Sequence, residues 1–167
     1  MIEVSKAKGS YIYDHKNKRY LDFVAGVSAC SVGHCNNEVI NAIKDQLDKH
    51  MHVMVYGEYI QDSQLALAKN LASVLPDNLQ CSYIVNSGTE AIEAALKLAK
   101  RFTGCSKLVA CKNSYHGSTH GSLSVAGNPT KQSSFKPLLP EVDFIRFNEK
   151  ADLNAITIDT AAVILSL

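Results

Sequence analysis

Three consecutive residues, Ser87-Gly88-Thr89, have the types and the position needed to bind an anion. They follow a short run with β-branched residues and precede apolar residues at helical spacing, so a helix is expected to begin at this turn. Glu90 gives the Ser-x-x-Glu spacing of a capping box, which favours the same start. The first N–H groups of a helix lack intrahelical acceptors and lie at the positive end of its dipole. The turn therefore predicts a phosphate site, although the same residues also suit an ordinary capped helix.

A second group, Tyr115-His116-Gly117, follows an apolar run at residues 107–111. Its tyrosine offers a flat aromatic surface on which a ring-shaped ligand can stack, and the alternative is a partly buried loop tyrosine. Together the two groups indicate a ligand with both a phosphate and a ring.

The elements expected to position these groups alternate between strands and helices from residue 82 onward. Strands are expected at residues 82–86, 107–111, 142–147 and 161–165, and helices from the turn to residue 101 and over residues 149–156. The first of these helices has an apolar stripe of Ala91, Ile92, Ala95, Leu96 and Ala99. This order predicts an α/β fold with a mostly parallel sheet, in which ligands bind at the carboxyl ends of the strands.

The residues before 82 have a different pattern. Two strand-like runs at residues 11–14 and 19–23 flank a polar turn, which predicts a β-hairpin. A loop rich in small residues is expected at residues 24–34. Helices are predicted over residues 38–50, capped by Asn36 or Asn37, and from residue 62 or 63 to just before Pro76.

Charge and composition exclude some classes of function. The net charge of +1 shows no basic surface for nucleic acid, and no run approaches the ~18 apolar residues of a membrane helix. The five cysteines form no Cys-x-x-Cys pair, and residues 1–6 lack the apolar run of a secretory signal. A cytoplasmic protein without nucleic-acid or membrane partners is expected.

Other chemistries have weaker support. There is no Gly-x-Gly-x-x-Gly and no Gly-x-x-x-x-Gly-Lys-[Ser/Thr] motif. His116 and His120 have the spacing of two zinc ligands on a helix, which would suit a metal-dependent hydrolase, but no third ligand is placed by the sequence, and no metal is expected. Cys111 lies near His116 and could act as a nucleophile, although a cysteine in this setting is more often a small core residue.

These segments resemble the class III aminotransferases, which are fold-type I enzymes that use pyridoxal 5'-phosphate. The resemblance rests on residues 86–91 and 95–99, with residues 9–14, 19–23, 33–35 and 115–117 in the family's order. It covers essentially the whole chain and points to the acetylornithine and ornithine aminotransferase group. It implies that residues 1–60 form a hairpin and helix segment of the small domain and substrate entrance. Residues 61–167 would be an incomplete cofactor-binding large domain.

The resemblance also implies roles for individual residues. Ser87, Gly88 and Thr89 would hold the cofactor phosphate, Tyr115 would stack on the pyridine ring, and His116 and Gly117 would shape the adjacent wall. The substrates would be an amino acid or amine and a 2-oxo acid. The family works as a homodimer with its active sites at the subunit interface, close to which residues 51–61 would lie.

Two substrate positions depart from the ornithine and acetylornithine pattern. Ser118 stands where those members have an arginine that binds a substrate carboxylate, and Val27 stands where ornithine-type members have a tyrosine. A serine cannot replace the bidentate donation of an arginine. Both changes weaken the assignment of those substrates, and the amino donor stays open.

The family continues with a Glu-Pro pair where this chain has Ser166-Leu167. Its Schiff-base lysine and the aspartate that pairs with the pyridine nitrogen lie beyond this point, so no catalytic residue is assigned. We expect the chain to be a truncated piece that is inactive in transamination on its own. A non-catalytic module that binds the cofactor phosphate, or another protein, is the alternative.

Overall fold

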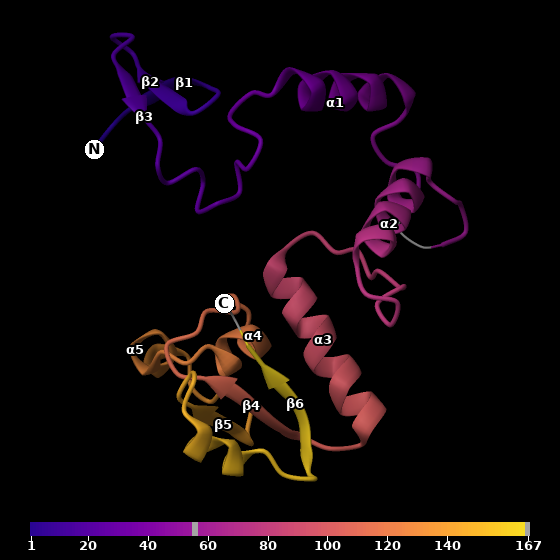
Figure 1. Ribbon diagram of the computed structural model, residues 1–167, viewed down its shortest axis with the longest axis vertical. Helices are drawn as coiled ribbons and strands as arrows, with labels where there is room; N and C mark the ends of the chain where they lie inside the picture. The colour runs from indigo at the N-terminus through magenta and orange to yellow at the C-terminus, as the bar shows by residue number, and fades with distance from the viewer. Residues whose placement is uncertain (55–56, 166–167) are drawn as a thin grey trace. The chain divides into compact units, whose positions relative to one another are not determined.

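A computed structural model describes residues 1–54 and 57–165 of the chain (Figure 1). The chain divides into two compact units, Met1–Gln61 and Asp62–Leu167. In the part that the structure describes, no helix combines the length and the hydropathy needed to cross a membrane.

The first unit contains an antiparallel sheet and one helix. The sheet has the order β1-β2-β3, formed by Val4–Lys8, Tyr11–Asp14 and Arg19–Leu21. The pairing of β2 with β3 confirms the predicted hairpin, whose turn is closed by two backbone N–H groups that donate to Asp14 Oδ1. Strand β1 was not predicted, because its exposed residues do not alternate between apolar and polar.

Helix α1 spans Asn37–Lys49, within one residue of the predicted bounds. Asn36 caps it, since its Oδ1 accepts hydrogen bonds from the N–H groups of Glu38 and Val39. No described residue of the first unit is buried. The local hydrogen bonds of this unit therefore contribute more to its order than a hydrophobic core does.

The second unit contains a parallel sheet with helices. The sheet has the order β5-β4-β6, formed by Val142–Ile145, Lys107–Cys111 and Thr160–Ile164, and both pairings are parallel. The helices are α2, Asp62–Val74; α3, Gly88–Thr103; α4, His120–Val125; and α5, Pro129–Gln132. Two 3-10 helices, η1 at Ser133–Phe135 and η2 at Lys150–Ala155, complete the unit. The predicted α/β fold with a parallel sheet is confirmed.

Strand β4 is the centre of the core, because its side chains are buried on both faces. Leu108 and Ala110 pack with Leu96 of α3 and Val125 of α4 on one face. Val109 and Cys111 pack with Ile145 of β5 on the other. Helices α3 and α4 therefore share one side of the sheet with each other.

Several details of the second unit differ from the sequence predictions. Residues 82–86 form no strand, because a strand requires hydrogen bonds to a neighbour and no described segment pairs with them. Ala91 and Ala95 are exposed, so the buried stripe of α3 is narrower than predicted and runs through Leu96. The helix expected over residues 149–156 is a 3-10 helix at residues 150–155. Helix α4 was not predicted, because its His-Gly-Ser start has no helix signal.

Candidate functional site

The N-terminus of α3 has the geometry of an anion site. Ser87, in extended conformation, caps the helix by accepting a hydrogen bond at Oγ from the N–H of Glu90 at 3.3 Å. The Glu90 carboxylate in turn accepts from the N–H of Asn86 at 2.8 Å, one residue earlier than a capping box requires. Within residues 1–54 and 57–165, no acceptor is bonded to the N–H of Gly88 or Thr89. Two backbone donors are therefore available at the positive end of a 16-residue helix.

The loop after β4 lies against this turn. A Cβ on Gly117 would overlap the Thr89 hydroxyl and would lie 2.7 Å from Ser122 Oγ. Gly117 also has φ +128°, a conformation that L side chains rarely adopt. The structure thus brings together two groups that are 28 residues apart in the sequence, the turn and the Tyr115-His116-Gly117 loop.

His116 and Tyr115 lie in different environments. The His116 side chain is buried at 7% exposure, and its Nε2 has no hydrogen-bond partner in the described part of the chain. Burial lowers the pKa of this imidazole, so the ring is neutral at pH 7. Tyr115 is 59% exposed, and Lys131 Nζ lies 5.2 Å from the centroid of its ring.

A hollow of about 530 Å³ lies beside Tyr115. Its lining includes Ser118, Lys131 and Phe135, which offer a hydroxyl, a cation and an exposed aromatic ring. Lys131 was not singled out from the sequence, because it lies 16 residues beyond Tyr115 in a segment without a motif.

A cluster of polar side chains behind the turn, which was not predicted, is formed by Thr89, Glu93, Thr119 and Ser122. Thr89 Oγ1 lies 2.8 Å from Thr119 Oγ1 and 2.6 Å from Ser122 Oγ. Glu93, one turn further along α3, accepts from the hydroxyl of Thr119 and from the N–H groups of Gly121 and Ser122. Because these partners are 26 to 33 positions apart, no local pattern could have indicated them.

Val27, the other predicted substrate residue, lies in the first unit. It is 87% exposed and has φ +56°, within a run of left-handed residues from Ala25 to Ser28. Asp22 anchors the start of this run by accepting hydrogen bonds from the N–H groups of Val24 and Ala25. Its other carboxylate oxygen lies 2.7 Å from His34 Nε2. The hydrogen bond with His34, followed by the backbone bonds, lowers the pKa of Asp22.

The alternative chemistries have less geometric support. His120 opens α4 whereas His116 precedes it, so the two histidines do not lie one turn apart on a single helix. Among the described residues, no group of three or more His, Cys, Asp or Glu side chains is placed to hold a metal ion. The Cys111 side chain is buried at 4% exposure in the core, which agrees with the interpretation as a core residue.

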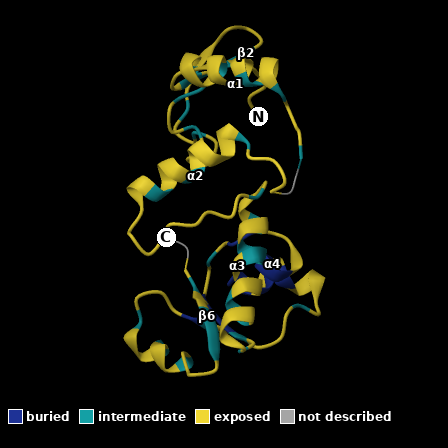
Figure 2. Cartoon of the chain, turned by 90° about the vertical axis from the view of Figure 1, so that its right-hand side faces the viewer, coloured by how far each residue is buried: buried dark blue, intermediate teal, exposed yellow. Residues whose placement is uncertain are grey.

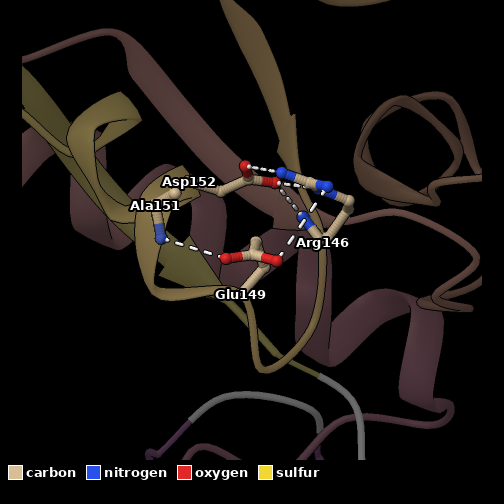
Figure 3. Close-up of polar contacts among 4 residues, drawn as sticks. All are labelled: Arg146, Glu149, Ala151 and Asp152. Carbon is tan, nitrogen blue, oxygen red and sulfur yellow. Dashed lines mark hydrogen bonds and ion pairs between the residues drawn. The ribbon is translucent and has the colours of Figure 1, made fainter.

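A further cation lies just beyond the carboxyl end of β5, but it is already paired. The Arg146 guanidinium donates to both carboxylate oxygens of Asp152, at 3.0 and 2.7 Å (Figure 3). Glu149 lies 4.0 Å from the same guanidinium and caps η2 through the N–H of Ala151. This cluster closes the loop between β5 and η2. Because the Arg146 charge is already paired with Asp152, the α3 turn is the better site for an anion.

Comparison with known proteins identifies relatives over almost the whole chain. A sequence model described as Aminotransferase class-III matches residues 1–165. The acetylornithine aminotransferase of Archaeoglobus fulgidus is 38% identical over 167 residues, which are 99% of this chain and 44% of that protein. The [LysW]-aminoadipate semialdehyde/glutamate semialdehyde transaminase of Sulfolobus acidocaldarius is 39% identical over 165 residues, which are 98% of this chain and 42% of that protein. The chain thus spans less than half the length of these relatives.

Solved structures share this fold. The adenosylmethionine-8-amino-7-oxononanoate aminotransferase of Methanocaldococcus jannaschii superposes with a TM-score of 0.88 at 28% identity, over 98% of this chain and 40% of that one. The ornithine aminotransferase of Toxoplasma gondii superposes with a TM-score of 0.85 at 26% identity, over 98% of this chain and 40% of that one. One structure of the Toxoplasma protein is described as having partial occupancy of PLP at its active site.

Proposed function

Because the chain belongs to the class-III aminotransferase family, we propose that it serves an enzyme that transfers an amino group with pyridoxal 5'-phosphate as cofactor. The donor would be an amino acid or amine and the acceptor a 2-oxo acid. When bound, pyridoxal phosphate supplies the electron sink that lets an amino group leave one carbon skeleton and join another.

The observation that carries the proposal is the pair of N–H groups at Gly88 and Thr89, which have no acceptor in the described part of the chain. A phosphate dianion at this turn would accept from both donors and from the Ser87 hydroxyl, and the helix dipole would favour its charge. A Cβ built on Gly88 meets nothing within 4 Å, so the space in front of the turn is open. The turn fits a phosphate in both charge and room.

The Tyr115-His116-Gly117 loop provides the features that a ring requires. Tyr115 exposes more than half of its surface, and Lys131 lies over its ring, so an aromatic ligand would stack on the face away from that cation. The buried Nε2 of His116 has no partner in the described chain, and a bound group could provide one.

We propose Ser118 and Val27 as substrate-contacting residues, each within its own unit. Ser118 lines the hollow beside Tyr115 and has no charge, so it would contribute one hydrogen bond to a substrate. Val27 would present a bare isopropyl group at the substrate entrance. These side chains favour an amino substrate whose binding there does not depend on an arginine–carboxylate pair.

We also propose a homodimer and a cytoplasmic location for the protein. The five cysteines are free thiols, as is usual in a reducing compartment. Sedimentation of the protein under reducing conditions tests the dimer.

Binding of pyridoxal 5'-phosphate to the 167-residue chain tests the phosphate site. We expect the 31P resonance of the ligand to shift on titration and pyridoxal, which lacks the phosphate, to bind at least about tenfold more weakly. Ser87→Ala should weaken the binding of pyridoxal phosphate and leave that of pyridoxal unchanged. Equal affinities for the two ligands, or no binding, would contradict the proposed site.

Activity assays of the same chain test whether it binds the cofactor without catalysing amino transfer. We expect no amino transfer from a panel of amino acids to 2-oxoglutarate, because none of its lysines matches the family's Schiff-base motif. Turnover, together with borohydride reduction that fixes the cofactor onto this polypeptide, would show that this expectation is wrong.

A further inference from the structure

Glu93 forms the N-terminal cap of a helix other than its own. Its Oε1 accepts hydrogen bonds from the N–H groups of Gly121 at 2.8 Å and Ser122 at 3.1 Å, the first turn of α4. Thr119 occupies the N-cap position of α4, but its side chain forms no cap hydrogen bond. The Glu93 carboxylate of α3 thus accepts the hydrogen bonds that a side chain at the N-cap position of α4 would usually accept.

The Glu93 carboxylate is ionised at neutral pH. Burial alone would raise its pKa, but the hydrogen bonds from Thr119, Ser122 and Gly121, with the positive charge that His120 can carry, outweigh burial and lower it. An ionised carboxylate only accepts hydrogen bonds, so the Thr119 hydroxyl must donate its single proton to Glu93.

This donation orders the remaining hydroxyl groups. Because Thr119 Oγ1 has no second proton, Thr89 Oγ1, 2.8 Å away, acts as the donor in the bond between them. Ser122 Oγ lies 2.6 Å from Thr89 Oγ1, 3.0 Å from Thr119 Oγ1 and 3.2 Å from the Thr119 carbonyl oxygen. Because the Thr89 proton is engaged and this contact is the shortest, we assign the Ser122 proton to Thr89. The protons therefore run in one direction, from Ser122 to Thr89, to Thr119 and to Glu93.

Two glycines provide the space for this chain of hydrogen bonds. A Cβ on Gly121 would overlap the Glu93 carboxylate, and one on Gly117 would overlap the Thr89 hydroxyl. Both glycines are buried. The absence of side chains at these two glycines therefore lets α3, α4 and the preceding loop approach closely enough to form the polar contacts.

We propose that Glu93 and Thr119 are positioning residues for the phosphate-binding turn, and that Thr89 binds the phosphate through its backbone N–H because its hydroxyl proton is engaged by Thr119. This inference rests on the proposed function, since it concerns the same turn. Neither residue touches the ligand. They act by holding the Thr89 side chain, and with it the direction of the Thr89 N–H.

The test compares Glu93→Ala, Glu93→Gln and Thr119→Val in the 167-residue chain. Affinities for pyridoxal phosphate and pyridoxal are measured by titration, and the amide resonances of Thr89 and Gly121 by NMR. Glu93→Ala should weaken the binding of pyridoxal phosphate about tenfold, because a misdirected Thr89 N–H would lose its hydrogen bond to the charged phosphate, and should leave the binding of pyridoxal unchanged. Glu93→Gln keeps the accepting oxygen and should restore affinity to within about threefold. Glu38→Ala, an exposed glutamate in the first turn of α1, is the matched control and should change neither affinity.

The outcomes separate the two proposals. If the unmodified chain shows no preference for the phosphorylated ligand, the proposed function fails. If that preference is present but Glu93→Ala retains it in full, or Glu93→Gln fails to restore it, the positioning role is wrong. Should Glu93→Ala fail to fold, Thr119→Val decides: a shifted Thr89 amide and weaker phosphate binding support the inference, and unmodified affinity overturns it.

Discussion

At the scale of single residues, Arg146 and Asp152 form a bidentate ion pair, the shortest among the described residues of the second unit. The carboxylate accepts two bonds from the guanidinium and a third from the backbone N–H of Arg146 at 2.7 Å. These bonds, led by the one between the two side chains, hold the pKa of Asp152 far below its ordinary value. A carboxyl whose pKa is lower in the folded state stabilises that state at neutral pH.

Asp152→Asn should therefore lower the melting temperature of the chain at pH 7. The stability from this pair is fully present above the ordinary aspartate pKa of ~3.9, and it is lost as the pH falls through the folded-state pKa. The difference between variant and unmodified protein should shrink below pH 4 in thermal melts. Asp77→Asn, at an exposed aspartate whose side chain forms no hydrogen bond or ion pair with the described residues, is the control. A difference that grew on acidification would contradict this account.

Residue types alone predicted the capping serine but not the cluster behind it. Ser87 and Glu90 are three positions apart, and local spacing is enough to predict that the serine caps the helix. Glu93 binds residues 26 to 29 positions away, and its role depends on how α3 and α4 pack. In the sequence Glu93 resembles any glutamate on the surface of a helix. Only Gly121, whose lack of a side chain leaves room for the Glu93 carboxylate, indicates a close contact.

At the scale of elements, α4 is a short helix held at both ends by side chains from outside it. Glu93 caps its first turn, and Gln132 closes its last. The Gln132 amide donates to three carbonyl oxygens, those of Leu123, Ser124 and Ala126, at 2.7 to 3.3 Å. The helix is also buried almost throughout (Figure 2).

Gln132→Ala should destabilise the second unit by about 1–3 kcal/mol, because the Ser124 carbonyl loses its donor and the other two carbonyls each keep only a backbone N–H donor. Chemical denaturation followed by circular dichroism measures the change. Gln80→Ala is the matched control, since that exposed glutamine also donates to two carbonyl groups but in contact with solvent. Its cost should stay within about 0.5 kcal/mol. Equal losses in the two variants would show that burial of the capped carbonyls is unimportant.

Elements with strong local patterns were predicted well, and those that depend on neighbours were not. The continuous apolar run of β4 and the Asn36 cap of α1 set these elements to within one residue. Residues 82–86 have strand-forming side chains but no described partner, so the composition alone was misleading. Helix α4 forms in a polar segment because tertiary contacts override weak propensity.

At the scale of the whole chain, burial is concentrated in one of the two units. Every buried apolar side chain that the structure describes belongs to residues 96–145, whereas the described part of Met1–Gln61 has none. The free energy of local opening follows the number of buried apolar contacts. The two units should therefore differ in how often their backbone hydrogen bonds open.

Hydrogen exchange measured by mass spectrometry should show this difference. We expect the slowest amides in β4 and α3, and exchange at least about tenfold faster in β1, β2 and α1. Leu108→Ala, a fully buried leucine, should accelerate exchange across the second unit but not the first. Leu47→Ala, at a half-exposed leucine of α1, is the control and should leave the second unit unchanged. Uniform protection along the chain would be inconsistent with this distribution of burial.

The short length of α4 has a consequence for the order of folding. Six residues are too few for a helix to nucleate in water, so α4 must wait until α3 has presented Glu93 and the loop has brought Gln132 into place. The Thr89 side chain is then fixed in the same cooperative step. A ligand that binds only the completed turn adds RT ln(1 + [L]/Kd) to the stability of that assembly. For this chain, the concentration of the cofactor would therefore influence how much of the second unit is folded. The melting temperature of that unit would rise with the logarithm of the concentration of free pyridoxal phosphate.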